Sequence, residues 1–267
     1  MATYLDRILA AHRAVAADDH RSVDQLCEQA AALSPTRGFT RALADATGLG
    51  VIAEVKRRSP SKGDLVADLD PAALAGSYER GGATCLSVLT DADWFGGSPE
   101  DLAAARAAVT IPVLRKDFTV SEADVCDARI MGADAVLLIA AALDDVELKA
   151  FHQLATEIGL DALVEIHDEA ELERAMAVGA TLVGVNQRDL VTFQVDTDRA
   201  VRMAPLMPPG VVRVAESGVR GTDDATLLAE AGYHAVLVGE SLVTAPDPIE
   251  AVRLLSTSAS NREEIHP

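Results

Sequence analysis

The chain has little cysteine and few basic residues for its length. Cys27, Cys85 and Cys126 are the only cysteines among 267 residues, and no two have C-x-x-C spacing, which excludes a disulfide framework and a zinc knuckle. Lysine and arginine number 23 against 42 aspartates and glutamates, a net charge of −19 that repels nucleic acid and anionic lipid. We expect neither as a partner. A small anionic substrate remains possible, because a few cations and backbone N–H groups can make a locally positive pocket.

Long apolar runs are also missing. No stretch of about 18 uncharged apolar residues occurs, and charges from Asp6 onward interrupt the N-terminus before an apolar region can form. We therefore expect a cytoplasmic protein without a membrane span. Hydrophobic residues make up 49%, and Gly and Pro number 18 and 11, a composition typical of globular chains.

Several motifs of catalysis and cofactor binding are absent. The chain has no H-E-x-x-H, G-x-S-x-G or Walker A pattern, and its histidines are scattered, so we expect no metal and no cofactor. Residues 48–53 match G-x-G-x-x-A by letters, but they lead into a strand where a dinucleotide site needs a helix N-terminus.

A glycine followed by a short apolar run recurs along the chain. The four examples are Gly82–Val88, Gly132–Leu138, Gly179–Val185 and Gly232–Val238, with glycines 50, 47 and 53 residues apart. Each predicts a helix end followed by a strand, because glycine tolerates the conformation that ends helices and the run is too short for a helix. Four further apolar runs predict strands at Val51–Lys56, Pro112–Lys116, Leu160–Ile166 and Val211–Glu216.

Eight strands that alternate with helices predict an α/β fold, a (β/α)8 TIM barrel over about residues 51–256. Helix starts are expected at Asp70-Pro71, Ser98-Pro99, Ser121, Asp168 and Thr222. Residues 1–50 are an N-terminal helical extension, whose amphipathic stretches Tyr4–Ala17 and Ser22–Leu33 are expected to cap one barrel end. We expect residues 1–267 to form a single domain. An open doubly wound sheet is the alternative.

Polar side chains recur at the C-terminal ends of five expected strands, although buried parallel strands should be apolar. They are Glu54, Lys56, Lys116, Glu165, Asn186 and Glu216. Side chains alternate along a strand, so Ile52 shares a face with Glu54 and Lys56, and the same alternation sends the others to one rim. Barrel enzymes place catalytic residues there. For any one of these residues, the alternative interpretation is a surface charge just past a strand end. Because the pattern is shared by five strands, we favour a catalytic site at this rim.

The loops after the last two strands are typical of a phosphate site. Residues 216–218 and 238–240 offer backbone N–H groups ahead of a helix, and their glycines permit close approach of a ligand. Trp94 and Phe95 follow the second strand and form either a ring-binding wall or a hydrophobic lid. His167 follows the fifth strand, and we favour a loop residue over one that reaches the site.

These residues belong to longer motifs that resemble the indole-3-glycerol phosphate synthase family. The longest is Ile52–Gly63, IAEVKRRSPSKG. The resemblance continues through residues 89–98, 115–118, 163–166, 185–190, 216–218 and 238–242, nearly the whole chain. It implies a (β/α)8 barrel with a helical extension and a cofactor-free lyase of tryptophan biosynthesis. That lyase converts 1-(2-carboxyphenylamino)-1-deoxyribulose 5-phosphate to indole-3-glycerol phosphate, with loss of carbon dioxide and water.

The resemblance also implies catalytic roles. Lys116 would protonate the ribulose carbonyl as the aryl carbon attacks it, and Lys56 would pair with the substrate carboxylate or assist dehydration. Glu54 and Glu165 would be base and acid partners. An apolar lumen, or the proximity of two lysines, is expected to lower the lysine pKa values.

The remaining roles implied by the resemblance concern binding. Asn186 and Glu216 would hold the sugar hydroxyls. The other substrate- and phosphate-binding residues would be Ser59, Phe95, Arg188, Ser217, Gly218, Gly239 and Glu240. Glu240 departs from the family, in which many members carry Ser, and a carboxylate would repel a phosphate. We expect only the backbone N–H of Glu240 to face the ligand.

Two other functions stay open. A non-catalytic phosphate-binding module could keep the glycine loops but would lose the lysines, which are present. Another phosphosugar barrel, such as phosphoribosylanthranilate isomerase, would need a Cys/Asp pair at strand ends, whereas Cys85 begins a strand.

Overall fold

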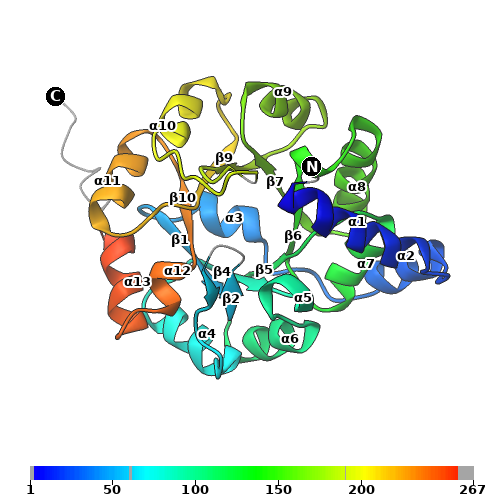
Figure 1. The fold of residues 1–267 in the computed structure, drawn as a ribbon, viewed down its shortest axis with the longest axis horizontal. Helices are drawn as coiled ribbons and strands as arrows, with labels where there is room; N and C mark the ends of the chain where they lie inside the picture. Colours follow the sequence, from blue (N-terminus) through cyan, green and yellow to red (C-terminus); the bar gives the residue numbers. More distant parts are fainter. Residues whose placement is uncertain (1–2, 60–61, 190, 258–267) are drawn as a thin grey trace.

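Eight parallel strands close into a barrel at the centre of the molecule (Figure 1). The computed structural model describes residues 3–59, 62–189 and 191–257. The strands are β1 (Gly50–Val55), β4 (Cys85–Leu89), β5 (Val113–Lys116), β6 (Ala135–Ile139), β7 (Asp161–Ile166), β8 (Leu182–Asn186), β9 (Val212–Glu216) and β10 (Ala235–Val238). Neighbours in the chain pair in parallel, and β10 pairs with β1. The predicted (β/α)8 barrel is confirmed, and the open sheet is wrong.

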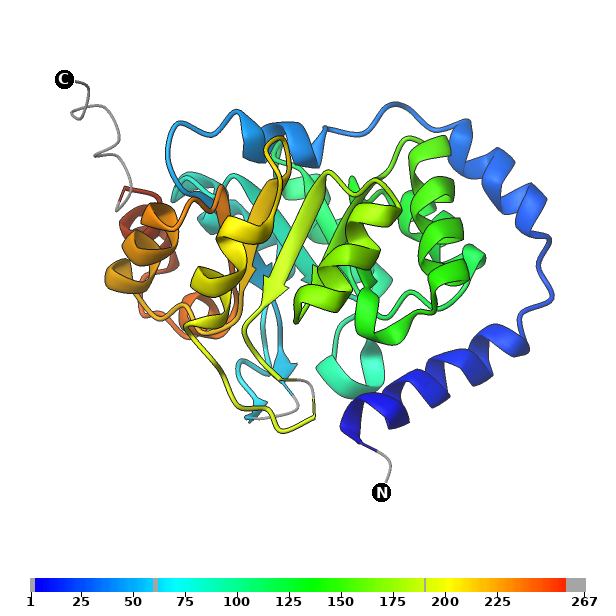
Figure 2. The same ribbon diagram turned by 90° about the horizontal axis from the view of Figure 1, so that it is seen from above.

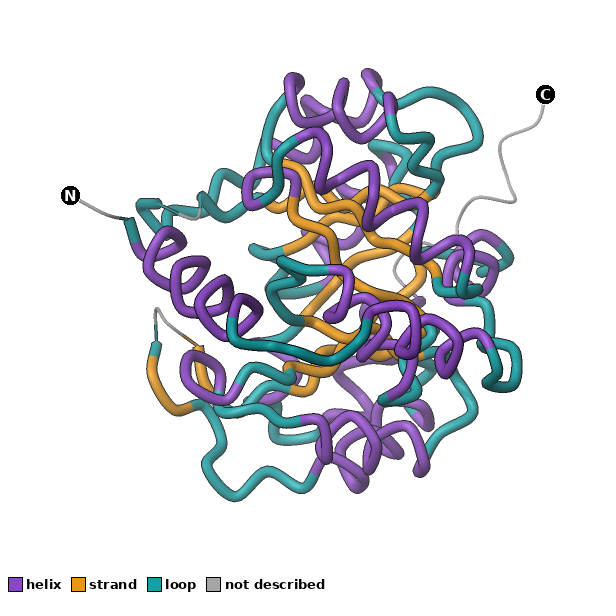
Figure 3. Tube along the Cα trace, turned by 90° about the vertical axis from the view of Figure 1, so that its right-hand side faces the viewer, coloured by secondary structure: helices purple, strands orange, loops and turns teal. Residues whose placement is uncertain are grey.

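Helices surround the strands (Figure 3). Those of the barrel are α4 (Pro71–Arg80), α5 (Ala92–Phe95), α6 (Pro99–Ala108), α7 (Glu122–Ile130), α8 (Asp145–Glu157), α9 (Glu169–Ala177), α10 (Arg199–Met203), α11 (Thr222–Glu230), α12 (Glu240–Val243) and α13 (Pro248–Thr257). As predicted, Asp70, Ser98 and Ser121 accept hydrogen bonds from backbone N–H groups in the first turns of α4, α6 and α7. Thr222 is instead the first residue of α11, and Gly221 precedes it as the N-cap.

Two hydrophobic clusters lie on the two faces of the barrel wall. Val51 and Val55 belong to the cluster between strands and helices, whereas Ile52 belongs to the cluster that fills the lumen. This split follows from the alternation of side chains along each strand. The lumen face of β1 is apolar at Ile52 and charged at Glu54, so the lumen changes from apolar to charged within one strand.

The N-terminal extension contacts the barrel at three separate places. Its helices α1 (Tyr4–Ala17) and α2 (Val23–Ala31) form where predicted, and of the two only α1 lies at a barrel end. α1 lies at the C-terminal ends of the strands, where Tyr4 lines a cavity, and α2 packs against α7. A third helix, α3 (Phe39–Ala44), covers the opposite end (Figure 2). The segment between α2 and α3 lets the chain cross from one end to the other.

A small antiparallel sheet, β2 (Arg58–Ser59) and β3 (Gly63–Asp64), follows β1 and was not predicted. It lies in the loop that carries the longest family motif. Over the described residues, no helix has both the length and the apolar character needed to cross a bilayer.

Candidate active site

A cavity of about 480 Å³ opens at the C-terminal ends of the strands. All of the residues predicted for the site line it, namely Glu54, Lys56, Ser59, Phe95, Lys116, Glu165, Asn186, Arg188, Glu216, Ser217, Gly218, Gly239 and Glu240. They meet because the carboxyl ends of all strands of a parallel barrel point to one rim. The structure therefore brings the set together; the roles of its members in binding and catalysis stay predictions.

Lys116, the last residue of β5, lies between two buried carboxylates. Its Nζ donates hydrogen bonds to Oε2 of Glu165 at 3.0 Å and to Oε2 of Glu216 at 2.8 Å, and both carboxylates are 2% exposed. Burial by itself lowers the pKa of an ammonium group, but negative charges outweigh it here and raise the pKa of Lys116. The charges are those of Glu165, Glu216 and Glu54. The expected lowering of the lysine pKa is therefore wrong for Lys116, because glutamates surround it.

The two carboxylates around Lys116 have different electrostatic environments. Burial favours protonation of Glu165, but the charges of Lys116 and His167 and a 3.0 Å hydrogen bond from Asn186 Nδ2 lower its pKa. Burial and the charge of Glu165 raise the pKa of Glu216 to about 7, despite Lys116. Oε1 of Glu216 is buried without a hydrogen-bond partner among the described residues. Glu165 is thus held ionised, whereas Glu216 can gain a proton near neutral pH.

Lys56 and Glu54 form a second charged pair at the end of β1, with Nζ 2.5 Å from Oε1. Gly239 packs so closely against this pair that an added Cβ would overlap both charged groups. Gly184 on β8 plays the same part beside Glu216, whose Oε1 occupies the space of a Cβ. Glycine at these two positions makes room for the charged side chains.

The backbone after β9 and β10 is suited to an anion. Ser217 and Gly218 have φ angles of 65° and 80°, a region that serine rarely adopts. Gly239 is the N-cap of α12, which begins at Glu240. Successive N–H groups in such turns form concavities that accept anions. The Glu240 carboxylate is 43% exposed and lies 3.5 Å from Nζ of Lys62, the nearest charge that it contacts.

The cavity also has an apolar wall, which sequence patterns identified only in part. Phe95 lines it, but Trp94 packs edge-on against Tyr4, with ring centroids 5.1 Å apart. Further apolar lining residues are Tyr4, Leu5, Ile8, Phe118, Leu137, Ile139, Phe193 and Val195. Strand alternation could have found Leu137 and Ile139, which share the lumen face of β6. No local pattern signals Tyr4, because its position depends on where α1 docks.

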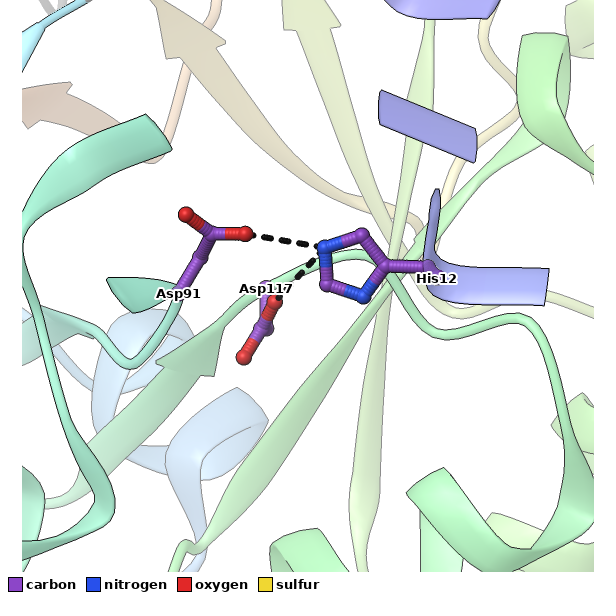
Figure 4. A group of neighbouring side chains, drawn as sticks. All are labelled: His12, Asp91 and Asp117. Carbon is purple, nitrogen blue, oxygen red and sulfur yellow. Dashed lines mark hydrogen bonds and ion pairs between the residues drawn. The ribbon is translucent and has the colours of Figure 1, made fainter. Parts of the chain in front are cut away.

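His12 of α1 meets two aspartates beside the cavity (Figure 4). Its Nε2 lies 2.8 Å from Oδ2 of Asp91 and 4.0 Å from Oδ1 of Asp117. The three groups are close enough to share a metal ion. The carboxylates are already engaged, however: Oδ1 of Asp91 accepts the N–H groups of Trp94 and Phe95, and both oxygens of Asp117 accept neighbouring donors. The cluster therefore ties α1 to the loops after β4 and β5, which carry part of the apolar wall.

Comparison with known proteins gives one consistent family. The family model described as indole-3-glycerol phosphate synthase matches residues 5–255. An indole-3-glycerol phosphate synthase of Nocardioides sp. is 58% identical over 79% of this chain and 81% of its own length. The indole-3-glycerol phosphate synthase of Mycolicibacterium smegmatis is 50% identical over 97% of this chain and 96% of its own length. The enzyme of Chlorobium luteolum is 47% identical over 92% of this chain and 95% of its own length.

Among solved structures, a thiamine phosphate pyrophosphorylase from Pyrococcus furiosus is similar in fold, with a TM-score of 0.59. The alignment covers 79% of this chain and 95% of the other at 15% identity. At that identity the likeness supports the barrel architecture alone.

Proposed function

The chain belongs to the indole-3-glycerol phosphate synthase family, and from that premise we propose how its residues carry out the reaction. The activity is that of a carboxy-lyase of tryptophan biosynthesis. It closes a ring in 1-(2-carboxyphenylamino)-1-deoxyribulose 5-phosphate and releases carbon dioxide and water to give indole-3-glycerol phosphate. The observation that carries this conclusion is 50% identity over 97% of the chain.

Lys116 is the general acid of ring closure in this proposal. Attack of the aryl carbon on the ribulose carbonyl places negative charge on the carbonyl oxygen, and a buried ammonium group can stabilise and protonate it. The two carboxylates at 2.8 and 3.0 Å hold the ammonium in place before substrate arrives. The raised pKa of Lys116 means that the charged, proton-donating form is present at neutral pH.

Lys56 and Glu54 form the second acid–base pair of the proposal. Lys56 pairs with the substrate carboxylate or assists dehydration, and Glu54 and Glu165 serve as base and acid partners in the reaction. Asn186 and Glu216 hold the sugar hydroxyls; both side chains line the cavity at the ends of neighbouring strands, which supports this role.

The phosphate is proposed to lie at the ends of β9 and β10. Its ligands are backbone N–H groups and hydroxyls of Ser59, Ser217, Gly218, Gly239 and Glu240. Arg188 contributes positive charge at the rim, where it lines the same cavity. Phe95 and the apolar wall receive the aryl ring of the substrate.

A direct assay tests this function. The purified protein is mixed with the carboxyphenylamino substrate and indole fluorescence is followed, before and after exhaustive chelation. We expect full turnover in both cases, because the proposed steps use protein side chains alone. Lack of product would refute the function, and a metal requirement would refute the mechanism. Cys85 lies at the closed end of the lumen, which disfavours the isomerase alternative.

Three coarser predictions accompany this function. The partner is a small phosphorylated molecule, as the family implies; the exclusion of nucleic acid rests on the net charge of −19. A cytoplasmic location stays a prediction. We also propose that residues 1–267 form one domain, which is supported by contacts of the extension with both barrel ends. Residues 1, 2, 60, 61, 190 and 258–267 lie outside the described residues.

A further inference from the structure

The proposed reaction consumes a proton, and this inference rests on that reaction. The substrate carries a carboxylate, whereas the products are an uncharged indole ring, carbon dioxide and water, with the phosphate unchanged. Charge balance therefore requires the uptake of one proton per turnover. Lys116 gives up a proton at ring closure and must be protonated again. The Lys116 side chain is 15% exposed, and it lines the cavity in which the proposed reaction places the substrate. A substrate bound there would separate Lys116 from bulk water.

His167 is a titratable group that lies behind the cavity wall and has no part in the proposed steps. It follows β7 directly, and its side chain is 13% exposed. Its Nε2 is buried without a hydrogen-bond partner among the described residues and lies 3.7 Å from Oε1 of Glu165. Its Nδ1 lies 3.0 Å from Oε2 of Glu171, which also accepts the backbone N–H of His167 at 2.7 Å. His167 is a loop residue, as predicted, and its ring does not line the cavity, but it adjoins a carboxylate that does.

The geometry links the protonation of His167 to that of Glu165. When Nδ1–H donates to Glu171 and the ring is neutral, Nε2 carries a lone pair and no hydrogen. This lone pair then faces the buried carboxylate of Glu165, and neither group can donate a hydrogen bond to the other. A proton on either His167 or Glu165 removes this conflict. The charged groups that face the ring are Glu165 on β7, Glu171 on α9 and Arg199 on α10. Burial and Arg199 disfavour the imidazolium, but the two glutamates outweigh them and raise the pKa of His167.

We propose that His167 is a positioning residue that acts through Glu165: it stores a proton beside the site and releases it when Lys116 must be protonated again. The Nε2–H bond breaks and an O–H bond forms at Oε1 of Glu165. Rotation of the carboxyl group then presents this proton to the uncharged amine of Lys116, which lies 3.0 Å from Oε2. His167 is left neutral and regains its proton from water after product release. The 3.7 Å gap exceeds a hydrogen bond, and such contacts commonly tighten when substrate binds.

Two variants and one control test the proposal. His167→Asn removes the stored proton but keeps an N–H group toward Glu171. Glu171→Gln keeps an oxygen that accepts the backbone N–H of His167 but removes the negative charge. His152→Asn on α8 is the matched control, since His152 is a half-buried histidine outside the cavity lining. For each protein, kcat and KM are measured from pH 5 to 9 in H2O and D2O, together with the melting temperature.

Each variant has a distinct expected result. His167→Asn lowers kcat by about 10²-fold, the low end for proton transfer, leaves KM nearly unchanged, enlarges the solvent isotope effect and abolishes the decline of kcat on the alkaline side. Glu171→Gln moves that decline to lower pH, because loss of the negative charge lowers the pKa of His167. His152→Asn changes neither kcat nor its pH dependence.

Other results overturn the proposal. A loss of kcat that is equal at every pH would show that His167 only supports the fold, and unchanged kcat would show that it has no part in turnover. If His167→Asn does not fold, an unshifted pH profile of Glu171→Gln refutes the proposal by itself. Turnover by the unmodified protein in the same assay separates these failures from failure of the proposed function.

Discussion

The two ends of the barrel are built from the same strands but differ in chemistry. At the N-terminal end, α3 inserts Phe39 and Leu43 into a lumen of aliphatic side chains, and both are at most 1% exposed. At the C-terminal end, the lumen face carries lysines and glutamates around an open cavity. A single β-strand passes from one environment to the other, as Ile52 and Glu54 do on β1.

This difference separates stability from function along the barrel axis. Apolar side chains stabilise the lumen at the closed end by leaving water, and a charge placed among them would lose its hydration. The lysines and glutamates at the strand ends of the open end are also largely buried, yet Lys56, Glu54, Lys116, Glu165 and Glu216 each have an oppositely charged neighbour within hydrogen-bond distance. Removing one partner at the open end therefore strands another charge. Because Glu216 can take up a proton when its partner is lost, we still expect substitutions at the open end to change activity more than stability, and substitutions at the closed end to do the reverse.

The largest expected effect is at the open end. Lys116→Met should lower kcat by roughly 10²- to 10⁴-fold, because it removes the proposed proton donor. Circular dichroism should show the folded protein. Lys149→Met, an exposed lysine of α8, is the control and should keep full activity. A fall in melting temperature large enough to explain the lost activity would make Lys116 a structural residue and abolish the contrast between the ends.

The opposite outcome is expected at the closed end. Phe39→Ala should lower the free energy of unfolding by about 3–5 kcal/mol, because it leaves a cavity among buried side chains. The kcat of the folded fraction should not change. Urea unfolding and activity in the absence of urea measure the two quantities. Val146→Ala, at a 78% exposed position, should change stability by less than about 0.5 kcal/mol. A kcat that fell with stability would mean that the ends are coupled.

Sequence patterns predicted the open end better than the closed end. The alternation of Ile52, Glu54 and Lys56 sufficed to place one rim of polar residues, because strand geometry fixes which side chains share a face. The helix α3 is six residues long and is held by contacts with distant strands, so no local period marks it. The error over the pKa of Lys116 has a similar cause, because the sequence does not state which charges come within 3 Å.

The phosphate end offers a third expected effect. Gly239→Val should raise KM strongly, because the added side chain overlaps Glu54 and Lys56 and blocks the approach of the phosphate. Steady-state kinetics and inorganic phosphate inhibition measure the loss. Gly159→Val controls for the substitution itself, since Gly159 lies outside the cavity lining with open space around it. Because Gly159 has a φ of 71°, which strains any residue with a side chain, the control variant should lose some stability, but its KM should stay the same. An unchanged KM in Gly239→Val would place the phosphate elsewhere.

A smaller effect concerns stability and pH. The pKa of Glu216 is raised from 4.5 to about 7, so the folded state binds more protons than the unfolded state between these values. Stability should therefore fall as pH rises from 4.5 to 7, and Glu216→Gln should lessen this fall. Urea unfolding at pH 5 and pH 8 measures it. Glu165 has a lowered pKa, so its ionised form stabilises the fold, and this contribution is lost only as the pH falls below 4.5. An identical pH dependence in both proteins would show that Glu216 is ionised throughout.

The smallest effect is expected for Glu240→Ser, which replaces the residue that departs from the family. The carboxylate is 43% exposed and contacts Lys62, itself 59% exposed, at 3.5 Å, and such surface pairs contribute about 0–1 kcal/mol. If only the backbone N–H of Glu240 binds phosphate, kcat and KM should stay within a few-fold, and KM could fall because a negative charge leaves the phosphate site. Lys62→Met removes the other member of the pair. Because Lys62 also lines the cavity, where its positive charge would attract the phosphate, we expect this variant to raise KM more than Glu240→Ser does. Loss of activity in Glu240→Ser would instead show that the Glu240 side chain takes part in substrate binding or catalysis.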